Sequence, residues 1–327
     1  MLNENAQLSA NIFADAIEKK ATRDGFGTGV VEAGKSDANV VVLCADLKES
    51  TRAEVFEKEF PDRFIEMGVA EQNMATVAAG MAHIGKVPFI TSYAAFNPGR
   101  NYEQIRTTVA LNNIAVKVCG MHAGVSVGPD GATHQMLEDI GLMRMLPNMI
   151  VLNPGDAEEA RKAVIAAAKT RGPVYLRFGR AATPVFTTPE TPFEIGKGLV
   201  VWQTEAPEVA IISTGSLTYT ALTAARTLAE RGIESVVVHL PTIKPLDTEI
   251  ILTAAKRAKR EVTLEEHQVA GGMGSAVAEL LSQNYPVPMR ILGVQDQFGQ
   301  SGTPEELLAH YGLNASAVEK AVRSLLN

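Results

Sequence analysis

Short apolar runs rich in Val and Ile alternate along the chain with longer amphipathic segments. The apolar runs are continuous rather than alternating, which is typical of strands covered on both faces. Segment 156–171 opens with acids and closes with bases, as the helix dipole favours, and so predicts a helix. Segment 1–20 is acidic and also has a helical pattern. The expected strands are 39–46, 63–69, 87–93, 114–120, 149–153, 173–179, 209–213, 235–239, 262–266 and 289–294, and the other expected helices are 217–231, 247–258, 274–284 and 314–326.

This alternation of strands and helices indicates a parallel sheet covered by helices on both faces. A link rich in Pro and Thr at 181–198 interrupts the alternation and is the best boundary between domains. The predicted fold class is therefore α/β, with two three-layer α/β domains. We expect a first domain at 1–190 with a mainly parallel sheet, and a second, smaller domain at 191–327.

Composition narrows the class of protein. The chain has 327 residues, 46% of them hydrophobic, with 27 Gly and 16 Pro, which is typical of a globular protein. The net charge of −7, without a basic block, makes nucleic acid an unexpected partner. No apolar run approaches the roughly 18–20 residues that a membrane span requires, so no membrane is expected. The absence of an export signal pattern, and two cysteines (Cys44 and Cys119) within apolar runs, favour a reducing, cytoplasmic location.

Polar and aromatic side chains collect where five of the expected strands end. Ligands of open α/β sheets bind beyond the carboxyl ends of the strands. Taken singly, each residue has a structural explanation, such as a first-turn acid for Glu71 or a core position for the aromatic residues. Their joint placement at one edge predicts a binding site instead. The residues are Asp46, Ser50, Glu71, Tyr93, Phe96, His122 and Arg180.

The loop "HAGVSVGPDGATHQ" (122–135) combines three glycines with polar side chains. Glycine permits backbone turns that are closed to other residues, so Asp130, Thr133 and His134 are expected close together. Such a loop suits a ligand with several hydroxyls, although a solvated glycine loop is the alternative. No GxxxxGK[ST], GxGxxG or GxSxG motif is found, and "GGMG" (271–274) is too short to indicate a nucleotide.

Four segments together resemble the C-terminal half of transketolases and of the related deoxyxylulose-phosphate synthases. They are "FPDRFIEMGVAEQNMATVAAGMA", "ITSYAAF", "VGPDGATHQMLEDIGLMRMLPNMIVLNPGDAEEA" and "VYLRFGR". The resemblance covers essentially residues 10–327. It implies the pyrimidine-binding domain and the C-terminal domain of a thiamine-diphosphate enzyme. The GDG…Asn-Asn signature of the domain that binds the diphosphate does not occur, so the chain resembles one subunit of a split transketolase.

The resemblance implies a cofactor site around Glu71. In this family the matching glutamate hydrogen-bonds ring nitrogen N1′ of the aminopyrimidine and thereby activates thiamine diphosphate, and a poorly hydrated pocket favours the shared proton. Phe96 is expected to stack on the pyrimidine, with Tyr93 as a second pocket aromatic. Asp46 and Leu47 are expected beside the cofactor. Mg²⁺ or Ca²⁺ is expected mainly on the partner chain, so no metal ligand is assigned here.

The resemblance also implies a sugar-phosphate site. His134 matches a catalytic histidine at the C1 hydroxyl and carbonyl of the substrate, and Asp130 matches the aspartate that contacts the C2 hydroxyl. Four further residues match the group that binds the phosphate, which guanidinium groups pair with bidentately. These residues are Arg23, Ser50, His122 and Arg180.

The activity that follows is transfer of a two-carbon ketol unit from a ketose phosphate to an aldose phosphate. It requires the N-terminal transketolase subunit, in an expected α2β2 assembly. Three alternatives stay open. A deoxyxylulose-phosphate synthase usually has Asp-Arg where this chain has Met121-His122; a 2-oxo acid dehydrogenase β subunit has little use for the phosphate group; a non-catalytic subunit would not need intact site residues.

The sequence departs from the family in one segment of the expected cofactor site. "FNPGRNYEQ" (96–104) carries an extra residue, so the pocket tyrosine that usually follows the stacking aromatic has no clean match. Whether Tyr102 replaces it is open.

Overall fold

A seven-stranded sheet organises the N-terminal part of the chain in the computed structural model, which describes residues 1–327. The strand order is β12–β6–β7–β5–β4–β2–β3, and every pair is parallel except β12 with β6. The strands are β2 (Val40–Cys44), β3 (Phe64–Glu66), β4 (Val87–Tyr93), β5 (Lys117–Met121), β6 (Ile150–Leu152), β7 (Val174–Arg177) and β12 (Thr242–Lys244).

Helices cover both faces of this sheet, because its buried strands are apolar on both sides. One face packs against α1, α3 and α7, and the other against α4, α6 and the π-helical turn Ile105–Ala110. The helices are α1 (Thr22–Ser36), α2 (Lys48–Thr51), α3 (Glu54–Glu59), α4 (Glu71–His83), α5 (Tyr102–Gln104), α6 (Asp139–Arg144) and α7 (Ala157–Lys169).

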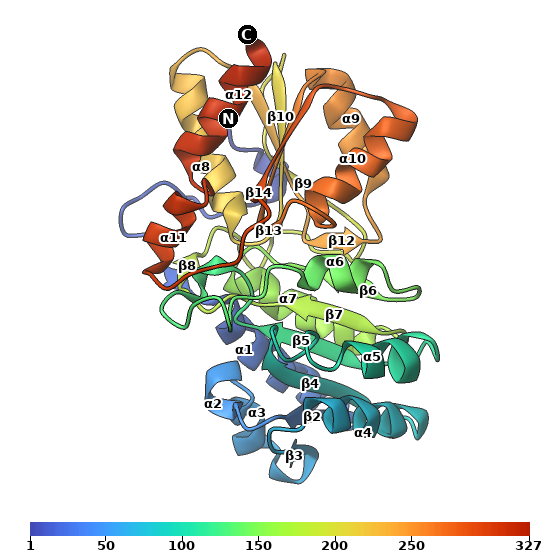
Figure 1. The fold of residues 1–327 in the computed structure, drawn as a ribbon. Helices are drawn as coiled ribbons and strands as arrows, with labels where there is room; N and C mark the ends of the chain where they lie inside the picture. Colours follow the sequence, from blue (N-terminus) through green and yellow to red (C-terminus); the bar gives the residue numbers. More distant parts are fainter.

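A five-stranded mixed sheet of order β14–β13–β10–β11–β9 forms the second unit, which lies beyond the first along the long axis of the molecule (Figure 1). Only β9 runs antiparallel to its neighbour. Helices α8 and α12 cover one face, and α9 and α10 the other. The elements are β9 (Leu199–Trp202), β10 (Val209–Ser213), β11 (Ser235–His239), β13 (Glu261–Gln268), β14 (Met289–Val294), α8 (Leu217–Glu230), α9 (Thr248–Ala258), α10 (Met273–Asn284), α11 (Pro304–His310) and α12 (Ala315–Leu326).

The predicted fold class is confirmed, and each expected strand corresponds to an observed one. The expected helix over 1–20 is wrong. This segment contains an isolated bridge of Leu2 with Trp202, a 3-10 turn at Glu4–Ala6 and further turns. It ends in the short strand β1 (Lys19–Lys20), which pairs with β8 (Thr183–Pro184). Phe13 lies edge-on against Trp202 at 6.3 Å, and Ile12 is buried in the core of the second unit, so tertiary contacts override the local pattern.

The two units exchange segments, so a division at residue 190 stays a prediction. Segment 1–14 packs on the second unit, while β12 belongs to the first sheet. A single apolar core also runs from α4 and α6 to α9 and α10. None of the helices is long and apolar enough to cross a membrane. Both cysteines are buried and free.

Candidate active site

The predicted site residues gather at the carboxyl edge of the first sheet. The order β7–β5–β4–β2–β3 places the loops that follow these strands side by side, as Figure 1 shows. Glu71, the acid that follows β3, is the first residue of α4, and its side chain is only 2% exposed. Its Oε2 accepts a hydrogen bond of 2.8 Å from Nη1 of Arg100. The buried acid therefore has a cationic partner from the loop after β4.

A ladder of flat side chains extends from this ion pair. The Arg100 guanidinium lies over the Phe96 ring at 4.5 Å from its centroid. Phe96 and Tyr93 are nearly parallel at 5.9 Å, and Tyr93 stacks on His122 at 4.2 Å. His134 meets the edge of Phe96 at 5.5 Å. The structure thus brings together aromatic residues that the sequence places up to 41 positions apart.

The loop that carries Arg100 is fixed on both sides of it. Asn97 is fully buried, and its Nδ2 donates to the carbonyl groups of β4 and β5 at residues 90 and 119. Nδ2 of Asn101 donates to Oδ1 of Asn97 and to the backbone oxygen of Glu71. A Cβ on Gly99 would collide with the backbone oxygen of residue 95, so glycine is required there. The Arg100 backbone is therefore held beside α4.

Arg23 is positioned by the close packing of α1 on α7. A Cβ on Gly25 would collide with the carbonyl oxygen of Ala157, so only glycine allows this approach. Nη1 of Arg23 then reaches the Ser50 carbonyl oxygen at 2.8 Å and Nε2 of His122 at 2.8 Å. Three of the four expected phosphate-binding residues are thereby in contact.

His122 is neutral near pH 7. Burial, followed by the positive charges of Arg23 and Arg180, lowers the pKa of His122 to about 3. Because Arg23 donates to Nε2, the ring hydrogen resides on Nδ1, which has no partner and is buried. His122 therefore orients the Arg23 guanidinium by accepting a hydrogen bond, without adding charge.

Positive charge accumulates around Arg23. Arg52 pairs with Asp24 at 2.6 Å, and Nη1 of Arg180 contacts Asp130 at 3.3 Å. Arg23 is half-buried and has no carboxylate partner. The pKa of Arg23 is lowered by burial and then by the charge of Arg52, with a smaller effect from Arg180. A half-buried guanidinium among other cations suits an anionic ligand.

Other predicted residues have mixed surroundings. Asp130 and Arg180, expected to contact different parts of the sugar phosphate, are joined to each other, and Arg180 also donates to the Val127 oxygen at 2.8 Å. Asp46 is exposed in a left-handed conformation with a φ of 56°, and Leu47 packs against the core beside α3. Their roles beside the cofactor stay predictions.

The glycine loop is held by the second unit. Gly124, Gly128 and Gly131 all have positive φ, as the sequence predicts. The backbone N–H of Ser126 donates to Oε1 of Glu266 at 2.5 Å, and a Cβ on Gly124 would collide with that carboxyl group. Nε2 of Gln135 donates to the backbone oxygen of residue 300 at 2.9 Å. The second unit thus contributes the support of the loop that carries Asp130 and His134.

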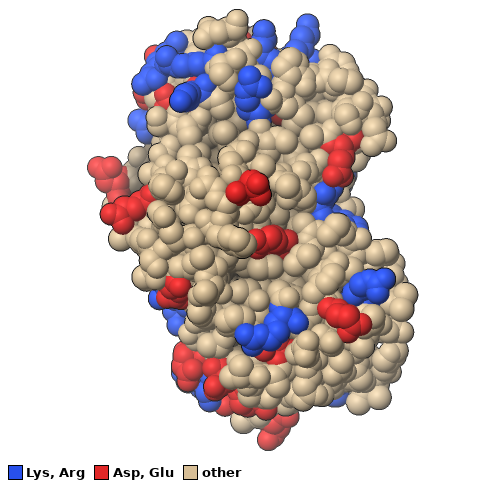
Figure 2. All heavy atoms as spheres, viewed as in Figure 1, with Lys and Arg blue, Asp and Glu red and all other residues tan.

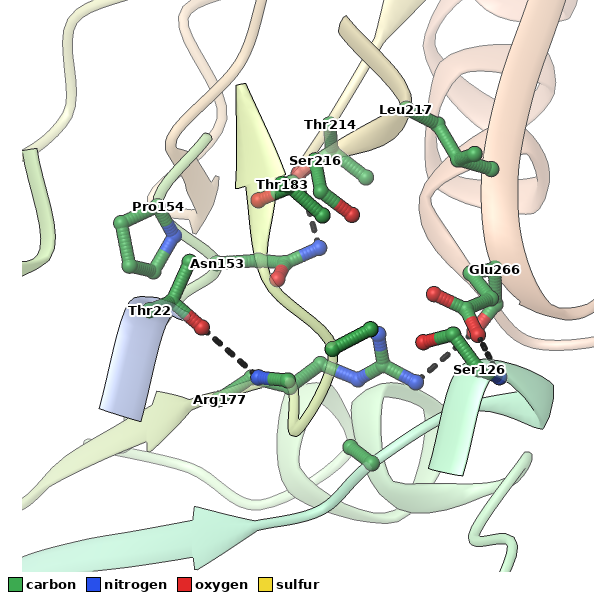
Figure 3. A pocket seen from close by; sticks show the side chains of 14 residues that line it. Thr22, Ser126, Asn153, Pro154, Arg177, Thr183, Thr214, Ser216, Leu217 and Glu266 are labelled. Atoms are coloured by element: carbon green, nitrogen blue, oxygen red, sulfur yellow. Dashed lines mark hydrogen bonds between the residues drawn. The ribbon is translucent and has the colours of Figure 1, made fainter. Parts of the chain in front are cut away.

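A small polar cavity lies between residues of the two units, beside Ala123 and Ser126 of this loop (Figure 3). Its volume of about 20 Å³ is enough for one water molecule. Nη2 of Arg177 donates to the Glu266 backbone oxygen at 2.8 Å, and Nε of Arg177 to Asp139 at 2.7 Å. The guanidinium of Arg177 is therefore paired within the protein. The residues that line the cavity include Thr22, Ser126, Asn153, Arg177, Thr183 and Glu266.

The "GGMG" segment begins α10, and its N–H groups bind an internal carboxylate. The N–H groups of Met273 and Gly274 donate to Glu265 at 2.6 and 2.8 Å. Tyr102 begins α5 and packs against the apolar core. Sequence reasoning missed Arg52, Arg100 and Glu266. For Arg100 alone a signal existed, since it lies in the segment with the extra residue.

Comparison with known proteins places the chain among the thiamine-diphosphate enzymes. Residues 18–185 match the family model for the transketolase pyrimidine-binding domain, and residues 196–318 match that for the transketolase C-terminal domain. The chain belongs to the transketolase family and contains both of these domains.

Three similar proteins align with this chain over nearly the full length of both chains. The chain is 43% identical over 307 residues to a putative transketolase C-terminal section of Methanocaldococcus jannaschii, covering 93% of this chain and 95% of that protein. It is 38% identical over 301 residues to one subunit of the apulose-4-phosphate transketolase of Phocaeicola vulgatus, covering 92% and 96%. A solved structure described as "Split gene transketolase, inactive beta4 tetramer" is 45% identical, with a TM-score of 0.87 over 94% of this chain and 98% of that one.

Proposed function

We propose that the chain is one of two subunits of a transketolase that transfers a two-carbon ketol unit from a ketose phosphate to an aldose phosphate. The domain that binds the cofactor diphosphate then resides on a separate N-terminal subunit. The names of the relatives, a C-terminal section, a single subunit of a transketolase and the product of a split gene, support this division. So does the inactive state of the related tetramer.

The observation that carries the proposal is the position of the Arg100 guanidinium, which contacts both Glu71 and Phe96. This planar N–C–N group is hydrogen-bonded to a buried carboxylate and lies over an aromatic ring. An aminopyrimidine presents the same kind of planar, nitrogen-bearing edge, so these side chains fit the cofactor that the family implies. Thiamine diphosphate supplies, when bound, a carbon nucleophile that attacks a ketose carbonyl. Glu71 would hold and share the proton at N1′, and Phe96 would orient the ring by stacking.

The cationic cluster supports a phosphorylated substrate. Arg23 has Ser50 and His122 as neighbours but no carboxylate, so its charge is available to a dianion. Arg180 needs only to loosen its 3.3 Å contact with Asp130 to add a second guanidinium. Phosphate can accept hydrogen bonds from both, and the charge-assisted bonds are strong. Asp130 would then be free to accept from a sugar hydroxyl, with His134 at the reacting end of the substrate.

The outward face of α4 supports contact with a partner chain. Its exposed residues Gln72, Asn73, Thr76, Val77 and Gly80 carry no charge. Figure 2 shows Lys and Arg gathered at the end of the molecule near the termini, and Asp and Glu over α2 and α3 at the other end. We propose that the N-terminal subunit, with its Mg²⁺ and diphosphate site, docks beside α4 in an α2β2 assembly. The two free thiols agree with a cytoplasmic enzyme.

The alternatives receive less support. The relatives described above are all named as transketolases, which favours this activity over that of a 2-oxo acid dehydrogenase. Met121-His122 differs from the Asp-Arg pair usual in deoxyxylulose-phosphate synthases. A non-catalytic subunit would have no need of the buried Glu71 and its aromatic neighbour.

Reconstitution tests the proposal. The purified chain is assayed for ketol transfer to an aldose phosphate, alone and mixed with the protein that carries the diphosphate-binding domain, with thiamine diphosphate and Mg²⁺. We expect activity only in the mixture. Activity of comparable size from this chain alone would contradict the division between two subunits.

A further inference from the structure

Arg100 lies in a fixed stretch of backbone, but its side chain is not enclosed. Its backbone neighbours are pinned through Asn97, Gly99 and Asn101, whereas its own side chain is 46% exposed. Glu71, by contrast, is 2% exposed and starts a helix, so it cannot follow a moving partner. The guanidinium can therefore leave Glu71 for solvent while both anchoring groups of the site remain in place.

We propose that Arg100 is an internal placeholder that occupies the two anchoring points of the cofactor's aminopyrimidine and must swing out when the cofactor binds. The inference rests on the proposed function. The Oε2 of Glu71 accepts from Arg100 at 2.8 Å, and the ring of Phe96 is covered by the same guanidinium at 4.5 Å. A pyrimidine that used this carboxylate and this ring would compete with Arg100 for both.

In the free subunit, Arg100 stabilises the buried carboxylate of Glu71. A buried carboxylate without a partner destabilises a protein strongly. Arg100 satisfies Glu71 until the cofactor supplies another hydrogen-bond partner. A pyrimidine bound at one end only would have to displace this contact, so the free subunit is expected to reject thiamine until the partner chain holds the diphosphate.

Competition between Arg100 and the pyrimidine predicts the direction in which cofactor affinity changes when Arg100 is removed. If Arg100 engages Glu71 in about 90–99% of molecules, apparent cofactor affinity is reduced about 10- to 100-fold. Removing the guanidinium then tightens cofactor binding. An Arg100 that instead stayed in place as a cofactor ligand would give the opposite result, because its removal would weaken binding.

The test is calorimetric titration of thiamine diphosphate, with Mg²⁺, into the reconstituted two-chain protein. We compare wild type with Arg100→Met, which keeps an apolar stem, and Arg100→Lys, which keeps the charge without the planar group. Arg106→Met is the matched control, since Arg106 is exposed and makes no ion pair. We expect about tenfold or greater tightening for Arg100→Met, a smaller tightening for Arg100→Lys and none for Arg106→Met.

Unchanged or weaker binding by a folded Arg100→Met protein would overturn the placeholder while leaving the proposed function intact. If neither wild type nor Arg100→Met binds the cofactor, both proposals fall. Unfolding of the free chain gives a second readout that requires no cofactor. Arg100→Met should lower the melting temperature, and the loss should be smaller in the background of Glu71→Gln. Strictly additive effects would show that the two side chains are not coupled, and would also overturn the placeholder.

Discussion

If Arg23 binds the substrate phosphate as proposed, its substitution by Met should impair phosphate binding and leave the chemistry of ketol transfer largely intact. Met keeps a flexible apolar stem and removes the guanidinium that contacts Ser50 and His122 at 2.8 Å. A hydrogen bond to a charged group contributes about 1.5–3 kcal/mol, and each 1.36 kcal/mol is a factor of ten. We therefore expect KM for a phosphorylated ketose to rise about 10- to 150-fold, with little change in kcat, because the phosphate lies away from the reacting carbon.

The assay uses two donors with the reconstituted enzyme, one phosphorylated and one without a phosphate, such as hydroxypyruvate. The second donor should retain its kcat/KM within about twofold, because it makes no contact that Arg23 could lose. In the free chain, inorganic phosphate should raise the melting temperature of wild type and not that of Arg23→Met. Equal losses with both donors would refute the reasoning, since they would show that Arg23 acts on the fold of the site rather than on the phosphate.

Three further outcomes are expected. Glu71→Gln should slow exchange of the cofactor C2 proton in the reconstituted enzyme by about 10²- to 10⁴-fold, followed by NMR, and an unchanged rate would remove Glu71 from the mechanism. Glu261 is buried without a partner, and burial raises its pKa to about 8. The folded state therefore binds this proton more tightly than the unfolded chain, and stability falls as pH rises toward 8. Between pH 5.5 and 8.5, Glu261→Gln should remove about 3 kcal/mol of this loss in urea unfolding, and identical pH profiles would disprove the burial effect. Glu266→Gln should increase amide hydrogen exchange at Ser126, and equal exchange would show that the loop is held by other contacts.

The layers of the fold could be predicted because its central strands are buried on both faces. The expected strand at 209–213 coincides with β10, whose five residues are all buried. Strand β12 could not be predicted, since it has only three residues and pairs with β6 some 90 positions earlier. Segment 1–20 has a helical pattern, yet Phe13 packs on Trp202, a contact that no local pattern contains.

The sequence predicts which edge of the sheet carries the site, but not which side chains contact one another there. Strand ends identify Glu71, Phe96 and His122, because parallel strands deliver their loops to one side. The ion pair of Arg100 with Glu71 joins residues 29 positions apart, and it depends on a loop that carries an extra residue. The contact of Arg180 with Asp130 spans 50 positions, and no sequence pattern indicates it.

The support of the glycine loop by Glu266 and by the backbone at residue 300 bears on how such enzymes diversify. If loop 122–135 replaced the corresponding loop of a related enzyme without the matching β13 and the segment before α11, it would lose these two hydrogen bonds. If the loop sets sugar preference as proposed, changes in the loop should be accompanied by changes in the second unit that holds it. Chimaeric enzymes that receive the loop together with β13 and the segment before α11 should keep the sugar selectivity of the enzyme from which these segments come. Chimaeras that receive the loop alone should lose that selectivity.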